Sequence, residues 1–79
     1  MSGRIDRIRC DLNMAQHRGL VRDRYCYAPG DGGRRWVVSI RTADMGLINR
    51  TLTTRETESL AYRLAAGEAL TYDQVERAR

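Results

Sequence analysis

The sequence predicts an α+β domain in which a three-stranded antiparallel sheet packs on one main α-helix, with a further helix at each end. A Gly-rich turn joins two segments with strand-like alternation, which is typical of a hairpin. A capping box opens an amphipathic helix after a third strand segment. The 79 residues suffice for one small core, so we expect a single domain over residues 1–79, with a sheet-plus-helix core over residues 22–67.

The first segment, residues 3–18, is compatible with two structures. Alternate positions from Ile8 to Leu12 are apolar, which suits a strand. Apolar residues also recur at spacings of three and four, as on one helix face, namely Ile5, Ile8, Leu12 and Ala15. The length of the segment favours a helix, which Ser2 would cap and Gly19 would end.

The next two segments have the alternation of strands. Residues 22–28 carry Tyr25 and Tyr27 on one face, and aromatic residues favour strands. Residues 29–33 form a Pro-Gly-Asp-Gly-Gly run that predicts a turn. Residues 34–42 form the clearest strand. Its two faces are Trp36, Val38 and Ile40 on one side, and Arg35, Val37, Ser39 and Arg41 on the other.

A third strand over residues 47–52 follows a turn at residues 43–46 and completes an antiparallel meander. A sheet with one apolar face must cover that face. Residues 54–66 have apolar side chains at helical spacing, so we expect this helix to cover the sheet. Trp36 is then the anchor of the core, and Tyr62 on the helix is expected to be buried or half-buried.

Two capping boxes mark the starts of the last two helices. Thr53 and Glu56 have the spacing at which side chain and backbone bond reciprocally, and Thr71 and Gln74 repeat it. Gly67 suits the left-handed position that ends the longer helix. The last helix is expected to be short and to fray towards the end of the chain.

Arginine dominates the charge of the chain. There are 14 arginines, no lysine and ten acidic residues, which gives a net charge of +4. Residues 1–50 hold ten Arg against five Asp, whereas residues 51–79 hold four Arg against five acidic residues. A basic chain favours an acidic partner such as nucleic acid. Arginines also keep a small sheet soluble, and a GC-rich genome produces the same lysine-free composition.

Several classes of protein are not expected. No apolar run approaches the roughly 18 residues of a membrane span, and the N-terminal segment lacks the apolar core of a signal peptide, so we expect a cytoplasmic protein. Cys10, Cys26 and the single His17 match no metal motif, and the cysteines are expected to be reduced. No catalytic constellation is evident, and the Gly-rich run does not open a helix as a phosphate loop does. We expect no enzyme activity, no cofactor and no metal.

Two motifs occur in a fixed order along residues 25–66. The first is the strand at residues 35–41 (RWVVSIR), with Tyr25 eleven residues before Trp36. The second is the TLTTRE motif, followed in the helix by Leu-Ala-Tyr and Ala-Ala. In this order they resemble the AP2-type DNA-binding domain and the related arm-binding domains of phage integrases, over about half of the chain.

That resemblance implies a sheet packed on a helix, with DNA contacts from the sheet. In the family, arginines on the first strand read DNA, whereas residues 25–29 here hold none. The turn between the second and third strands is shorter, and the family's third-strand Trp is missing. Only Arg35 and Arg41 fall on positions that the resemblance assigns to DNA, so sequence-specific reading is not carried over.

We therefore expect a small non-enzymatic basic binding module, of the kind that phages and mobile elements encode, which contacts DNA or RNA through the arginine-bearing sheet face. The candidate contact residues are Arg22, Arg24, Tyr25, Tyr27, Arg34, Arg35 and Arg41. The alternative is a protein-binding inhibitor of a host defence nuclease or nucleoprotein complex, because in size and lack of motifs the chain resembles anti-CRISPR proteins. A homodimer formed through a strand edge is a third possibility.

Overall fold

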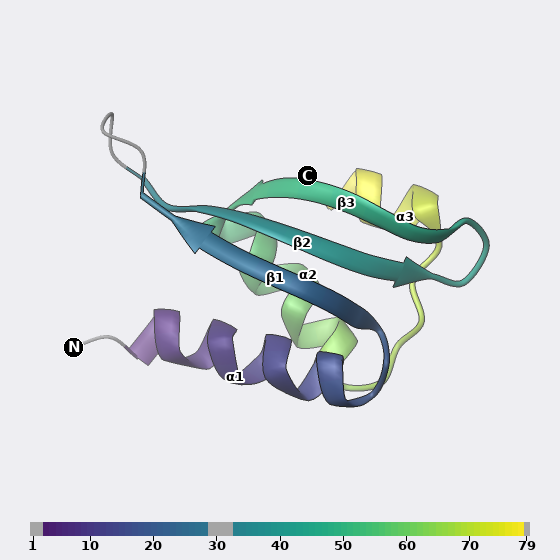
Figure 1. The fold of residues 1–79 in the computed structure, drawn as a ribbon, viewed down its shortest axis with the longest axis horizontal. Helices are drawn as coiled ribbons and strands as arrows, with labels where there is room; N and C mark the ends of the chain where they lie inside the picture. The colour runs from purple at the N-terminus through teal and green to yellow at the C-terminus, as the bar shows by residue number, and fades with distance from the viewer. Residues whose placement is uncertain (1–2, 29–32, 79) are drawn as a thin grey trace.

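A helix, three strands and two further helices follow one another along the chain, as predicted (Figure 1). The computed structural model describes residues 3–28 and 33–78. Its elements are α1 (Gly3–His17), β1 (Val21–Tyr27), β2 (Arg35–Thr42), β3 (Gly46–Thr53), α2 (Thr54–Ala65) and α3 (Tyr72–Arg77). The predicted cap at Ser2 and most of the predicted turn, residues 29–32, lie outside the described residues.

The three strands form one antiparallel sheet in the order β1-β2-β3. The β2–β3 register is regular from Arg35 opposite Thr53 to Thr42 opposite Gly46. The β1–β2 register shifts between Val21 and Arg24, so β1 carries a bulge near its start. Trp36, Val38 and Ile40 are all buried on one face of β2, which confirms the predicted alternation.

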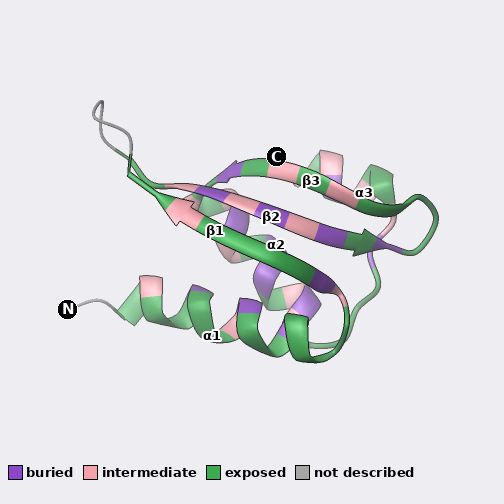
Figure 2. Ribbon diagram, in the orientation of Figure 1, coloured by how far each residue is buried: buried purple, intermediate pink, exposed green. Residues whose placement is uncertain are grey.

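Two helices build the core beneath the sheet. In Figure 1 the sheet lies in front of α2, and α1 runs alongside β1 and α2. The buried positions in Figure 2 gather where α1, α2 and the sheet face one another. The core extends beyond residues 22–67 at both ends, because it includes Ile8, Leu12, Ala15, Leu70 and Val75.

The first segment is a helix, and the strand alternative is wrong. Ile8, Leu12 and Ala15 are each 1 % exposed or less, so the three-and-four spacing marks the face that packs into the core. Cys10 is exposed on the other side. The helix ends at His17, and Gly19 follows with a φ of 81°, the left-handed conformation that glycine adopts most readily.

The start of α2 is built as its sequence predicts. The Glu56 backbone N–H donates to Thr53 Oγ1 at 3.2 Å, and the Thr53 N–H donates to Glu56 Oε1 at 2.9 Å. Trp36 is 2 % exposed and is the core anchor expected. Its indole N–H donates to Thr54 Oγ1 at 3.0 Å, which satisfies the one polar atom of this side chain.

The expectation for Tyr62 is wrong. Its side chain is 67 % exposed, although it lies on the main helix. The buried face of α2 is formed by Thr57, Leu60, Ala61 and Leu64. At 3.6 residues per turn, position 62 points away from the middle of that face. An aromatic residue in an amphipathic helix is therefore not always buried, because its position relative to the buried face decides its exposure.

The short helix α3 lies beside β3 (Figure 1). The capping box of Thr71 and Gln74 is present, and Val75 is buried. Arg50 of β3 forms an ion pair with Glu76, and its guanidinium lies 5.2 Å from the ring centre of Tyr72. The hydrogen bond to Glu76 is the main reason why the pKa of Arg50 is raised.

Candidate nucleic-acid interface

One face of the sheet is turned away from both helices, and Figure 1 looks onto it. Because side chains alternate along strands, the strand register identifies its residues. We call this surface the open face, and its described members are Tyr25, Tyr27, Arg35, Val37, Ser39, Arg41, Leu47, Asn49, Thr51 and Thr53. The ten paired members include two arginines and no acidic side chain. Alternation back from Tyr25 puts Asp23, in the adjacent bulge of β1, on the same side, where its carboxylate lies 3.8 Å from Arg22.

Two tyrosines form the aromatic part of the open face. Tyr25 and Tyr27 occupy alternate positions of the edge strand β1, opposite Val37 and Arg35. Their ring centres are 5.8 Å apart with an interplanar angle of 26°, so the rings are stacked. Tyr25 is 64 % exposed and Tyr27 38 % exposed. The pair is thus a large apolar surface in contact with solvent.

Two arginines form the cationic part. Arg35 and Arg41 lie six residues apart on β2, roughly 20 Å at the usual strand rise. Arg35 donates to the carbonyl oxygen of Arg34 at 3.3 Å, and Arg41 to that of Gly19 at 3.2 Å. Within the described residues neither is in an ion pair. Because a guanidinium has five N–H donors, each arginine keeps most of its hydrogen-bonding capacity for a ligand.

The other candidate arginines are arranged differently. Arg22 lies in the bulge of β1 beside Asp23, with 3.8 Å between Nε and Oδ2. Arg34 lies just before β2, and its Nη1 is 3.7 Å from the sulfur of Cys26. Arg24 is opposite the buried Val38 and belongs to the helix-facing side of the sheet, where its Nη1 donates to the Arg9 carbonyl at 3.5 Å.

The structure therefore brings together four of the seven candidates on one face: Tyr25, Tyr27, Arg35 and Arg41. Arg22 and Arg34 lie near the two ends of β1, and Arg24 is on the other side. Arg24 was expected to flank Arg35 and Arg41 because it falls in the sheet region of the sequence. Alternation along a strand, applied strictly, would have separated Arg24 from Tyr25.

Sequence reasoning missed the uncharged polar part of the open face. Asn49, Thr51 and Thr53 of β3 project beside Ser39, Val37 and Arg35. The Ser39 hydroxyl donates to Asn49 Oδ1 at 2.5 Å. In the sequence Leu52 stands between Thr51 and Thr53, and an apolar residue between two polar ones indicates which side of β3 faces the core.

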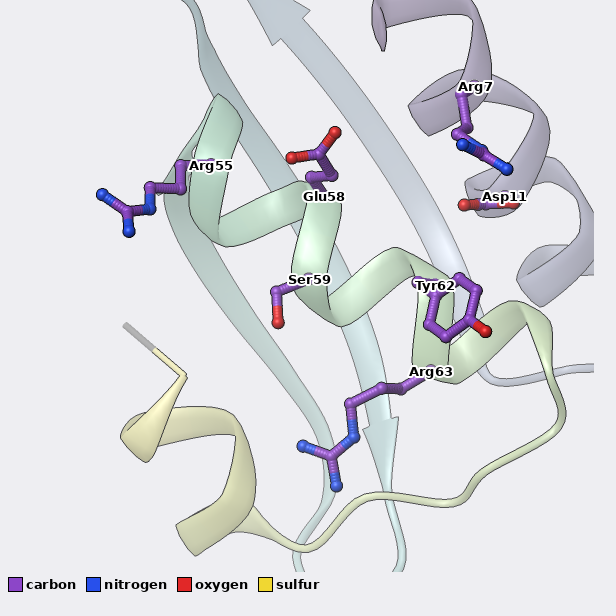
Figure 3. A pocket seen from close by; sticks show the side chains of 7 residues that line it. All are labelled: Arg7, Asp11, Arg55, Glu58, Ser59, Tyr62 and Arg63. Atoms are coloured by element: carbon purple, nitrogen blue, oxygen red, sulfur yellow. The ribbon is translucent and has the colours of Figure 1, made fainter.

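A hollow lies between α1 and α2, away from the sheet (Figure 3). Its lining residues are Arg7, Asp11, Arg55, Glu58, Ser59, Tyr62 and Arg63. Arg63 and Glu68 form an ion pair, which raises the pKa of Arg63 and lowers the pKa of Glu68. The hollow is lined by side chains of both charge signs.

Residues 3–28 and 33–78 hold no group of three or more His, Cys, Asp or Glu side chains placed to bind a metal ion. Cys10 and Cys26 are both free thiols. Every helix in these two segments is too short or too polar to cross a membrane.

No family model, curated protein or solved structure matches this chain, so function is inferred from the chemistry of its surface. The open face combines stacked aromatic rings, two guanidinium groups and a row of hydroxyl and amide groups.

Proposed function

We propose that this chain is a small non-enzymatic nucleic-acid-binding module whose open face contacts DNA or RNA. One observation carries the proposal: Arg35 and Arg41 share an uncovered sheet face with Tyr25 and Tyr27, and neither arginine is in an ion pair among the described residues. Guanidinium groups bind phosphate oxygens through two parallel hydrogen bonds. Exposed tyrosine rings offer the flat apolar surface on which bases stack.

The overall charge supports the same ligand. The net charge is +4 and the sequence pI is about 9.7. A net positive protein attracts a polyanion over the distance of a Debye length, before any contact forms. The resemblance of residues 25–66 to AP2-type domains agrees with a sheet face as the contact surface, although the chain lacks that family's first-strand arginines.

The test replaces both open-face arginines, as Arg35→Gln with Arg41→Gln. Binding of a labelled duplex and of a single strand of the same sequence is followed by fluorescence anisotropy at about 50 and 200 mM salt, the range over which phosphate contacts change affinity most clearly. We expect weaker binding, and a slope of log K against log salt that is smaller by about 1.4 to 1.8 for two lost phosphate contacts.

The matched control is Arg7→Gln with Arg55→Gln. These two arginines line the hollow between α1 and α2 and take part in no ion pair among the described residues. The control removes the same charge from the opposite side, so equal losses in both double variants would mean that only net charge matters. Absence of nucleic-acid binding by the wild-type protein at 50 mM salt would overturn the proposal.

A second candidate function is inhibition of a host defence nuclease or nucleoprotein complex by direct protein contact. The observation that favours it is Tyr62, a tyrosine 67 % exposed in a hollow with charges of both signs (Figure 3). Tyrosine is enriched at the centres of protein interfaces. The test compares target-nuclease inhibition by wild type and Tyr62→Ser; inhibition unchanged by this substitution argues against the hollow as the contact surface.

A further inference from the structure

We propose that the preferred ligand of the open face is a single-stranded nucleic acid, whose unpaired bases stack on Tyr25 and Tyr27. This inference rests on the proposed nucleic-acid function and adds the class of ligand. Its basis is the chemistry and placement of the stacked tyrosine pair, rather than the net charge of the chain.

The tyrosines lie where single-stranded bases can reach them. Both rings stand on the edge strand β1, on the side of the sheet opposite the helices. With 64 % and 38 % of their surfaces exposed, the two rings leave a substantial apolar area in water. The stack of Tyr25 on Tyr27 holds the rings side by side, so a base that packs on them meets a surface that is already ordered.

A duplex cannot use this surface in the same way. Inside a duplex both faces of every base are stacked on neighbouring bases, so only backbone and groove edges face a protein. In a single strand the bases can be turned outward and stacked on aromatic side chains. An exposed aromatic pair on a contact face is therefore matched to unpaired bases.

The arginines are placed to hold the backbone of the same strand. Arg35 is the register partner of Tyr27, so the two residues are neighbours across β1 and β2 at the same end of the sheet. Arg41 lies roughly 20 Å further along β2. The open face thus has aromatic rings and a phosphate-binding arginine at one end, and a second arginine at the other end. Proteins that bind single strands combine cationic and aromatic groups in this way.

The distribution of the other arginines argues against a duplex. A duplex has a phosphate backbone on each side of a groove, so cations on both flanks of a sheet in the groove could contact both backbones. On the β1 flank Arg24 is turned towards α1, and Arg22 lies beside Asp23. On the β3 flank Arg50 is held by Glu76 on the helix side. The open face thus has one line of cations, along β2, which suits one backbone.

The decisive variant is Tyr25→Leu with Tyr27→Leu, which keeps apolar side chains but removes both rings. Binding is measured with fluorescein-labelled 12-nucleotide single-stranded DNA, single-stranded RNA of the same sequence, and the matching DNA duplex. Loss of stacking on one base weakens binding by about 5- to 150-fold, so we expect at least a tenfold loss for the single strands. Duplex affinity and the salt slope should stay the same, because no charge is removed.

Two controls accompany this variant. Tyr62→Leu removes an exposed tyrosine from the opposite side and should leave single-strand affinity unchanged. Tyr25→Phe with Tyr27→Phe keeps both rings and should retain single-strand binding. The far-ultraviolet circular dichroism spectrum of each variant establishes that it is folded. If the double leucine variant does not fold, Tyr25→Leu alone carries the test, since Tyr25 is the more exposed of the two.

The outcomes separate this inference from the proposed function. If wild type binds neither single strands nor duplex, the nucleic-acid function itself fails. If wild type binds duplex as tightly as single strands, or the double leucine variant binds single strands normally, the function stands and the inference is overturned. The DNA and RNA arms show which sugar the open face prefers.

Discussion

At the scale of single residues, the buried indole N–H of Trp36 requires a hydrogen-bond acceptor. It is a polar atom of a buried side chain, and its acceptor is Thr54 Oγ1 at 3.0 Å. Thr54→Val removes the acceptor but keeps the shape, and should lower the free energy of unfolding by about 1–3 kcal/mol, the cost of an unsatisfied buried donor.

Urea denaturation followed by the fluorescence of Trp36, the only tryptophan, measures the effect of Thr54→Val. The matched control is Thr51→Val, the same chemical change on the open face, which should alter stability by less than about 0.5 kcal/mol. Equal effects of the two substitutions would mean that the bond to Trp36 contributes nothing measurable.

Glu68 makes the stability of the protein depend on pH. The hydrogen bond from Arg63 is the main cause that lowers the pKa of Glu68 below its ordinary 4.5. A lowered folded-state pKa stabilises the fold above the ordinary value, and that contribution is lost as the pH falls through the folded-state pKa. Urea midpoints measured from pH 6 downward should therefore fall less steeply for Glu68→Gln than for wild type. Parallel curves would contradict the assignment.

At the scale of elements, α3 is the part of the fold least able to stand alone. It has six residues, and isolated helices of that length are unstable in water. Its attachment depends on the buried Leu70 and Val75, and on the ion pair of Arg50 with Glu76. Leu70→Ala should lower the free energy of unfolding by about 2–5 kcal/mol.

Amide hydrogen exchange distinguishes local from global loss in Leu70→Ala. We expect the amides of α3 to exchange faster relative to those of α2, because Leu70 precedes α3 and its carbonyl accepts from the Ala43 N–H at 2.8 Å. Leu47→Ala, on the open face and 37 % exposed, is the control with the same deletion and should have a much smaller effect. Uniform acceleration of exchange in α2 and α3 would show that α3 does not detach separately.

The elements also show what the sequence can and cannot predict. Both capping boxes and the alternation of β2 are local patterns, and the structure confirms them because few residues decide each one. The packing of α1 against α2 depends on contacts between segments far apart in the chain. The bulge in β1 is likewise visible only in the register with β2. The types of residue in the candidate site could therefore be predicted from the sequence, but the structure was needed to show which of them share the open face.

At the scale of the whole molecule, stability and the proposed binding function lie on opposite faces of one sheet. Trp36, Val38 and Ile40 of β2 hold the core together, while the residues between them reach solvent. Substitutions on the open face are therefore expected to leave the fold intact. This separation makes binding variants interpretable, because a loss of affinity need not reflect unfolding.

The same separation predicts how a ligand changes thermal stability. A ligand that binds only the folded state at 100 times its Kd stabilises that state by about 2.7 kcal/mol. For a domain of this size that corresponds to a rise in Tm of roughly 10–20 °C. The unfolded chain, with its 14 arginines, also attracts phosphate and reduces the shift. The measurement is therefore made at about 200 mM salt, where non-specific contacts are weak.

We expect a 12-nucleotide single strand to raise the Tm of the wild type and of Arg7→Gln with Arg55→Gln by similar amounts. The shift should be much smaller for Arg35→Gln with Arg41→Gln at the same oligonucleotide concentration, because that variant lacks both guanidinium groups of the open face. Differential scanning fluorimetry measures all three proteins side by side. If the two double variants show the same shift, the strand binds outside the open face, since the two pairs lie on opposite sides of the fold and carry equal charge.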